Sequence, residues 1–79
     1  MYLTTVIDNM HGNRRGCISL SMGDVEMHLA AILENWDCDY TEEEFQSIIK
    51  NMRGFANEDS KSYIEVWIKK ILPGDTFDL

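Results

Sequence analysis

The chain has 79 residues, 44% apolar and 27% charged, and its 14 acidic residues against 7 Lys and Arg give a net charge of −7. This balance is typical of a folded chain, and the length fits a single domain, residues 1–79, with a modest core. The negative charge argues against direct binding of nucleic acid or of an anionic membrane surface, because both need a basic footprint. No signal-peptide pattern and no apolar run of membrane-spanning length occur, so we expect a cytoplasmic protein.

The chain begins with two segments that are typical of β-strands. Residues 2–9 are rich in Thr, Val and Ile, and residues 17–21 alternate apolar and small polar side chains. Residues 11–16, His-Gly-Asn-Arg-Arg-Gly, join them as a turn. We therefore expect a β-hairpin that carries a small basic spot, Arg14-Arg15, at its tip.

Two helices are expected next, and a capping pattern marks the start of each. Ser21 with Asp24, and Thr41 with Glu44, have the spacing of a capping box. Gly54 stands where the C-cap of the second helix belongs. An apolar stripe with helical spacing follows each cap: Val25, Leu29, Ile32, Leu33 and Trp36 in the first helix, and Phe45, Ile48, Ile49 and Met52 in the second.

A third helix is expected from about Asp59 or Ser60 to Pro73-Gly74. Its apolar stripe consists of Ile64, Trp67, Ile68 and Ile71. Residues 75–79 look like a loose tail. The predicted fold is a small α+β domain in which a β-hairpin is followed by three helices, in the order ββααα.

Residues 36–45, Trp-Asp-Cys-Asp-Tyr-Thr-Glu-Glu-Glu-Phe, hold five acids between two aromatic residues. Asp37, Asp39 and Thr41 match the first three ligand positions of a calcium loop. The sixth position is Glu42 where that loop needs Gly, and the twelfth is Ile48 where it needs Glu. The pattern therefore argues against a calcium site.

A helix start explains Thr41 and the three glutamates after it, because negative charge is favourable at the positive end of a helix dipole. It does not explain Asp37 and Asp39. With Glu34 and the glutamates they make six acids between positions 34 and 44, without a Lys or Arg. This acidic patch is either a solvated surface or a docking surface. In the second interpretation the candidate partner-binding residues are Glu34, Asp37, Asp39, Glu42 and Glu43.

The sequence offers little support for other chemistry. His11, His28, Cys17 and Cys38 lack the spacing of zinc ligands, and no pattern places a base beside either cysteine. We expect two free, largely buried thiols, no metal, no cofactor and no catalytic activity.

Residues 39–45, followed by Ile48-Ile49-Lys50, resemble the start of the first helix in the immunity proteins that neutralise DNase colicins. The resemblance implies a small acidic cytoplasmic protein that inhibits a basic nuclease by covering it with an acidic face. The chain departs from that family elsewhere. The family is all helical and has an acidic, Tyr-containing inhibitory loop that has no counterpart here, so a different fold is expected.

These observations predict a small acidic, non-enzymatic protein that binds one partner protein and inhibits or adapts it, with the acidic patch covering a basic site. Proteins that handle nucleic acids are one source of such a basic surface. The alternative is a homodimeric structural or assembly module, formed through the third helix or a strand edge.

Overall fold

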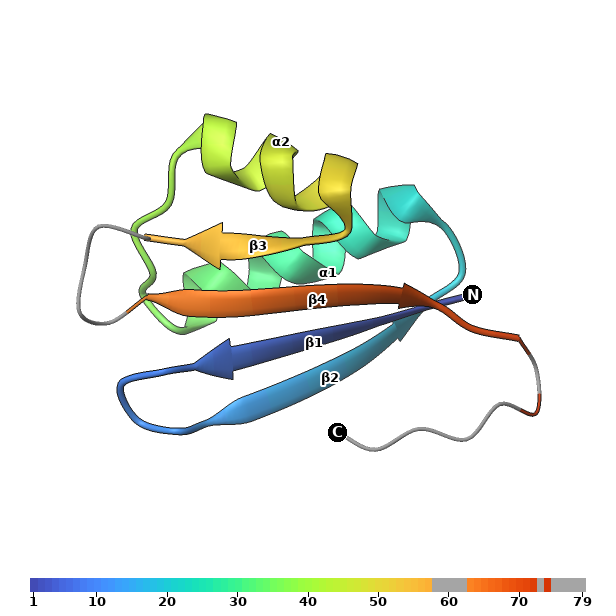
Figure 1. The fold of residues 1–79 in the computed structure, drawn as a ribbon, viewed down its shortest axis with the longest axis horizontal. Coiled ribbons are helices and arrows are strands. Elements are labelled where there is room, and N and C mark those ends of the chain that lie inside the picture. Colours follow the sequence, from blue (N-terminus) through green and yellow to red (C-terminus); the bar gives the residue numbers. More distant parts are fainter. Residues whose placement is uncertain (58–62, 73, 75–79) are drawn as a thin grey trace.

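The computed structural model describes residues 1–57, 63–72 and 74. The order of elements is β1 (Tyr2–Asp8), β2 (Arg14–Ser19), α1 (Met22–Asn35), α2 (Glu42–Asn51), β3 (Arg53–Ala56) and β4 (Ile64–Lys70). The strands form one antiparallel sheet in the order β2-β1-β4-β3. Helix α1 crosses one face of this sheet, and α2 lies alongside β3 (Figure 1).

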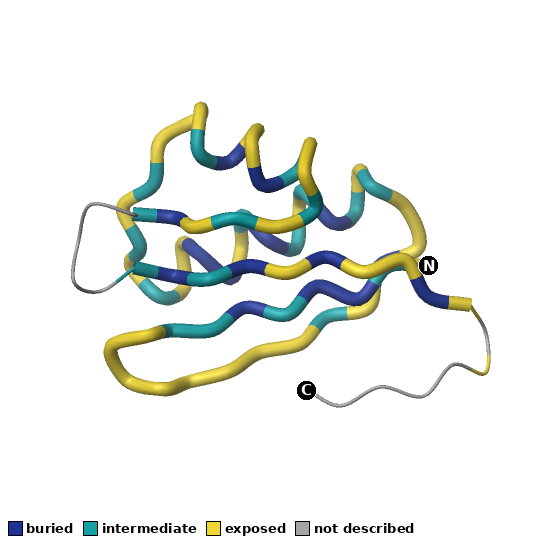
Figure 2. The backbone as a smooth tube through the Cα atoms, viewed as in Figure 1, coloured by how far each residue is buried: buried dark blue, intermediate teal, exposed yellow. Residues whose placement is uncertain are grey.

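The core lies between the sheet and the helices. Along β4, buried residues alternate with more exposed ones, as expected of a strand with one covered face (Figure 2). In β1, Thr4 and Val6 are buried on this face, and Leu3 is buried as well. The cluster that fills this layer consists of Val6, Ala56, Ile64, Val66 and Ile68 from the strands, Val25, Leu29, Ile32 and Leu33 from α1, and Phe45 and Ile48 from α2.

Both predicted helix starts are confirmed. The side chain of Ser21 accepts a hydrogen bond from the Asp24 N–H at 3.2 Å. Thr41 and Glu44 form a complete capping box, in which the Thr41 hydroxyl accepts from the Glu44 N–H at 3.1 Å and the Glu44 carboxylate accepts from the Thr41 N–H at 3.0 Å. The expected C-cap at Gly54 is wrong, because α2 ends at Asn51 and Met52 adopts the left-handed conformation with φ 60°.

The predicted hairpin exists, but its turn lies earlier in the chain than expected. The turn is closed by hydrogen bonds from the Asp8 N–H to the Asn13 carbonyl and from the Gly12 N–H to the Asp8 carbonyl. Arg14 and Arg15 therefore belong to β2 rather than to the tip. Successive strand residues point to opposite faces, so the two arginines do not form one basic spot.

The third helix was a wrong prediction, and so was the order ββααα. Residues Ile64–Lys70 form β4, which pairs with β1 on one side and β3 on the other. The spacing of Ile64, Trp67 and Ile68 fits a helix, but Ile64, Val66 and Ile68 also alternate with less buried residues, as in a strand. The expected helix start at 59–60, the end at Pro73 and the tail at 75–79 lie outside the described residues. The observed order is ββααββ, still α+β.

The sheet face opposite the helices carries exposed aromatic residues. Phe55 is 41% exposed and Trp67 46% exposed. Tyr63 packs edge-on against Phe55 with ring centroids 5.5 Å apart, and the indole N–H of Trp67 donates to Glu65 at 2.6 Å. Within the described part of the chain, no helix combines the length and apolar character that crossing a membrane requires.

Candidate partner-binding site

The structure leaves all five predicted partner-binding residues exposed to solvent. Glu34 belongs to the last turn of α1, Asp37 and Asp39 to the connection between the helices, and Glu42 and Glu43 to the first turn of α2. Residues 34–43 therefore form one continuous stretch at one end of the molecule, called the acidic segment below (Figure 1).

Every second side chain in the connection between α1 and α2 packs against the core and holds this segment in place. Trp36, Cys38 and Tyr40 are partly buried and pack against the core, whereas Asp37 and Asp39 point outwards. The Tyr40 and Phe45 rings pack against each other with centroids 5.7 Å apart. Anchoring by three side chains gives the two outward carboxylates a defined position.

Asp37 takes the backbone conformation that ends α1. Its φ is 52°, in the left-handed region that Asp tolerates better than most residues. The Asp37 N–H donates to the Glu34 carbonyl at 3.1 Å, and the Cys38 N–H donates to the Leu33 carbonyl at 3.0 Å. Asp37 therefore has two roles: it adopts the left-handed conformation that the turn needs, and it adds a negative charge to the surface.

The Cys38 thiol lies within the negative field of this end. Burial, then the carboxylates of Glu44, Asp39 and Asp8, raise the pKa of Cys38 above its usual value, because each disfavours a thiolate. Asp8 ends β1 and thus adds to the charge at this end. Among the described residues, the members of the acidic segment form no ion pair with Lys or Arg.

Asp8 itself is tied into the hairpin turn. Its carboxylate accepts hydrogen bonds from the N–H groups of Met10 at 2.9 Å and His11 at 3.3 Å, and its other oxygen lies 2.9 Å from Nδ1 of His11. Burial raises the pKa of Asp8, but the hydrogen bonds and the charge of His11 outweigh it, so the pKa lies below its ordinary value.

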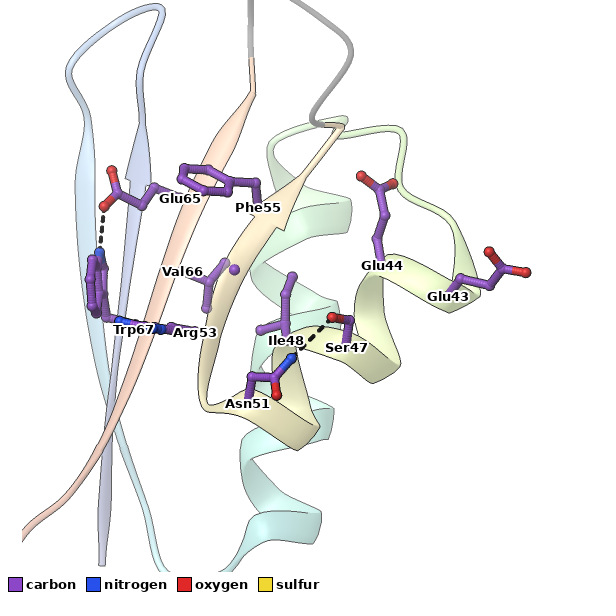
Figure 3. Close-up of a pocket in the computed structure, with 11 residues that line it drawn as sticks. Glu43, Glu44, Ser47, Ile48, Asn51, Arg53, Phe55, Glu65, Val66 and Trp67 are labelled. Atoms are coloured by element: carbon purple, nitrogen blue, oxygen red, sulfur yellow. Dashed lines mark hydrogen bonds between the residues drawn. The ribbon is translucent and has the colours of Figure 1, made fainter.

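A groove runs between α2 and the outer edge of β3 (Figure 3). Its volume is about 810 Å³. Ser47 and Asn51 lie on the side of α2 that faces the strand, joined by a hydrogen bond of 3.3 Å from the Asn51 amide to the Ser47 hydroxyl. The full lining comprises Glu43, Glu44, Ser47, Ile48 and Asn51 from α2, Arg53, Gly54 and Phe55 from β3, and Glu65, Val66 and Trp67 from β4.

Sequence reasoning identified only one contributor to this groove as a site residue, Glu43. The groove exists because β3 and β4 are strands. A helix was expected where β4 lies, and only a helix C-cap at Gly54 was expected where β3 lies. The alternation in residues 63–69, Tyr-Ile-Glu-Val-Trp-Ile-Lys, was the signal that could have revealed it.

A second, smaller hollow of about 380 Å³ lies between β2 and α1, and it brings Cys17 and His28 to the same place. Nδ1 of His28 shares a hydrogen bond of 2.7 Å with the hydroxyl of Ser19, which is 2% exposed. Among the described residues, no hydrogen bond joins Cys17 to His28 and no carboxylate contacts the imidazole. The pair therefore lacks the arrangement that activates a cysteine nucleophile.

Metal-ligating residues do not gather in the described part of the chain, where no group of three or more His, Cys, Asp or Glu could hold an ion. Cys17 and Cys38 are both free, as expected, but each is only partly buried.

Comparison with protein-family models, with curated proteins and with solved structures finds no match for this chain.

Proposed function

We propose that the protein is a non-enzymatic binding protein that covers a basic site on one partner protein with its acidic segment, and thereby inhibits or adapts that partner. The observation that carries the proposal is the exposure of five carboxylates in a short stretch anchored by Trp36, Cys38 and Tyr40. A protein that handles nucleic acid is one kind of partner with the required basic surface.

The charge of this end predicts how such a complex would form. An acidic surface that meets a basic one mainly raises the association rate, and salt screens it over about 8 Å at physiological ionic strength. Binding of this kind should therefore slow as salt is added.

The alternative is a homodimer, and its predicted interface on a third helix is ruled out because that helix is a strand. A strand edge remains, since β2 and β3 stand at the two ends of the sheet and Ile18 of β2 is 51% exposed. Light scattering over a range of protein concentrations separates the two cases, because a stable dimer favours assembly and a monomer favours partner binding.

The experiment for the main proposal uses two matched pairs of substitutions. The first, Asp37→Asn with Asp39→Asn, neutralises the connection, and Asn also tolerates the left-handed conformation at position 37. The second, Asp24→Asn with Glu26→Gln, removes two carboxylates near the start of α1, at the opposite end of that helix. Both pairs change the net charge of −7 by the same amount.

Partners are captured from native lysate with wild type and both variants, and association rates of the captured protein are measured against salt. We expect the first pair to slow association and flatten its salt dependence, and the second pair to stay close to wild type. Equal effects of the two pairs would show that only net charge matters, and the proposal would then be wrong.

A further inference from the structure

The outer edge of β3 has unused main-chain groups. The N–H of Ile68 donates to the carbonyl of Met52 at 2.8 Å. Bonded and non-bonded pairs alternate along an antiparallel ladder, so Gly54 and Ala56 also bond to β4, and the N–H and C=O of Arg53 and Phe55 point away from it. No other described residue hydrogen-bonds these four groups.

The groove borders this edge, and its lining extends from α2 across β3 to Glu65, Val66 and Trp67 of β4. Its volume of about 810 Å³ lies within the usual range for ligand sites, roughly 300–1,000 Å³. Gly54 has no side chain on the side of β3 toward α2, and Ile48 packs directly against it there, so α2 and β3 lie closest together at this point. Outward main-chain donors and acceptors beside a groove are what strand addition requires.

The walls favour a particular kind of segment. Among the described residues that line the groove, Glu43, Glu44 and Glu65 are acidic and Arg53 is basic, and Glu43 and Glu44 come from α2. Side chains of an added strand would alternate between the α2 wall and the open face that carries Phe55 and Trp67. Basic side chains suit the α2 wall, where Glu43 lies at the rim of the groove. Apolar side chains suit the open face with Phe55 and Trp67.

We propose that the groove binds an extended segment of the partner, which adds to the sheet beside β3 and alternates basic side chains toward α2 with apolar side chains toward Phe55. This inference rests on the proposed function, since it assigns the segment to the same basic partner. It adds a second contact, on the β3 edge, to the one made by the acidic segment.

The probe is a capped synthetic hexapeptide of alternating lysine and valine, titrated into the full chain and followed by the amide NMR signals. We expect the amide signals of Arg53 and Phe55 to shift most and to exchange more slowly with solvent. Shifts confined to the β2 edge or to the acidic segment would overturn the proposal. If raising the protein concentration without peptide gives the same shifts, a second copy of the chain occupies the groove, and this result would also overturn the proposal.

Two methylated peptides test whether the contact is a strand pairing. In a strand, the N–H groups of alternate residues point to the same side. One test peptide is N-methylated on its lysines and the other on its valines, and their affinities should therefore differ. One of them should lose affinity by about tenfold or more, and the other should bind nearly as well as the unmethylated peptide. Equal affinities would mean that no ladder forms.

Phe55→Pro and Phe55→Ala form the matched variants. The Phe55 N–H faces the groove, so proline there leaves the ladder to β4 intact but removes a donor and blocks the edge. Alanine removes the ring and keeps the donor. We expect proline to weaken peptide binding at least about tenfold more than alanine does. Equal losses would assign binding to the ring and overturn the proposal, provided that both variants keep the wild-type NMR spectrum elsewhere.

The Asp37→Asn/Asp39→Asn pair separates this inference from the proposed function. If that pair alters association with the partner while the peptide fails to bind the β3 edge, the acidic segment binds the partner and the groove does not. If the peptide binds the edge while that pair changes nothing, the groove binds a basic segment and the proposed role of the acidic segment is wrong.

Discussion

Ile48 of α2 lies directly over the main chain of Gly54 in β3. A Cβ added to Gly54 would stand 2.9 Å from Cγ1 of Ile48, closer than such atoms normally approach. Ile48 is 1% exposed and belongs to the core, so it has little freedom to move. The absence of a side chain at position 54 therefore sets how closely α2 approaches β3.

Gly54→Ala should lower the free energy of unfolding, because the added methyl group overpacks the contact with Ile48. Overpacking of this kind costs about 1–3 kcal/mol. The change is measured by urea unfolding. In an Ile48→Ala background the same substitution should cost clearly less, since the clashing Cγ1 is gone. A cost that is identical in both backgrounds would mean that Ile48 is not the obstacle.

Asp8→Asn should destabilise the protein at neutral pH. The folded pKa of Asp8 is lowered below its ordinary value of 3.8, so ionised Asp8 contributes stability that is complete above that value. This contribution is lost as the pH falls through the lower, folded pKa. Denaturant unfolding from pH 7 downward should show the gap between wild type and variant closing in acid. A gap that stays constant with pH would contradict a role for the Asp8 charge.

Cys38 should react slowly with alkylating reagents in the folded protein. Burial and the nearby carboxylates raise its pKa, and the thiolate is the reactive form. The measurement is iodoacetamide alkylation at pH 8 in a Cys17→Ser background, followed by mass spectrometry. Asp39→Asn should speed the reaction, whereas Asp24→Asn, on the first turn of α1, should not. Equal rates in these two variants would show that the Asp39 charge does not reach the thiol.

Thr4→Val should raise the free energy of unfolding. Thr4 is 0% exposed, and among the described residues no group hydrogen-bonds its hydroxyl. Replacing an unpaired buried hydroxyl by a methyl group of similar size removes a desolvation cost of about 1 kcal/mol or more. Both residues are β-branched, so the strand preference of the backbone is kept. Thr5→Val, on the opposite and less buried face, is the control, and a loss of stability in Thr4→Val would contradict the expectation.

The sequence by itself determined the features that depend on near neighbours in the chain. The caps at Ser21 and Thr41 and the two apolar stripes that follow them predicted α1 and α2, because a helix satisfies its hydrogen bonds within a single segment. The exposure of the acidic segment also followed, since charges without a partner stay in water.

Only the tertiary structure decided what residues 64–70 become. The spacing of Ile64, Trp67 and Ile68 suits a helix, and the alternation of Ile64, Val66 and Ile68 suits a strand. Pairing with β1 on one side and β3 on the other settles the choice, because a central strand needs two partners that lie far away in the sequence. The groove along β3 and the open aromatic face depend on that long-range pairing, which the local pattern allows but does not decide. The meeting of Cys17 with His28 depends instead on the packing of α1 against β2.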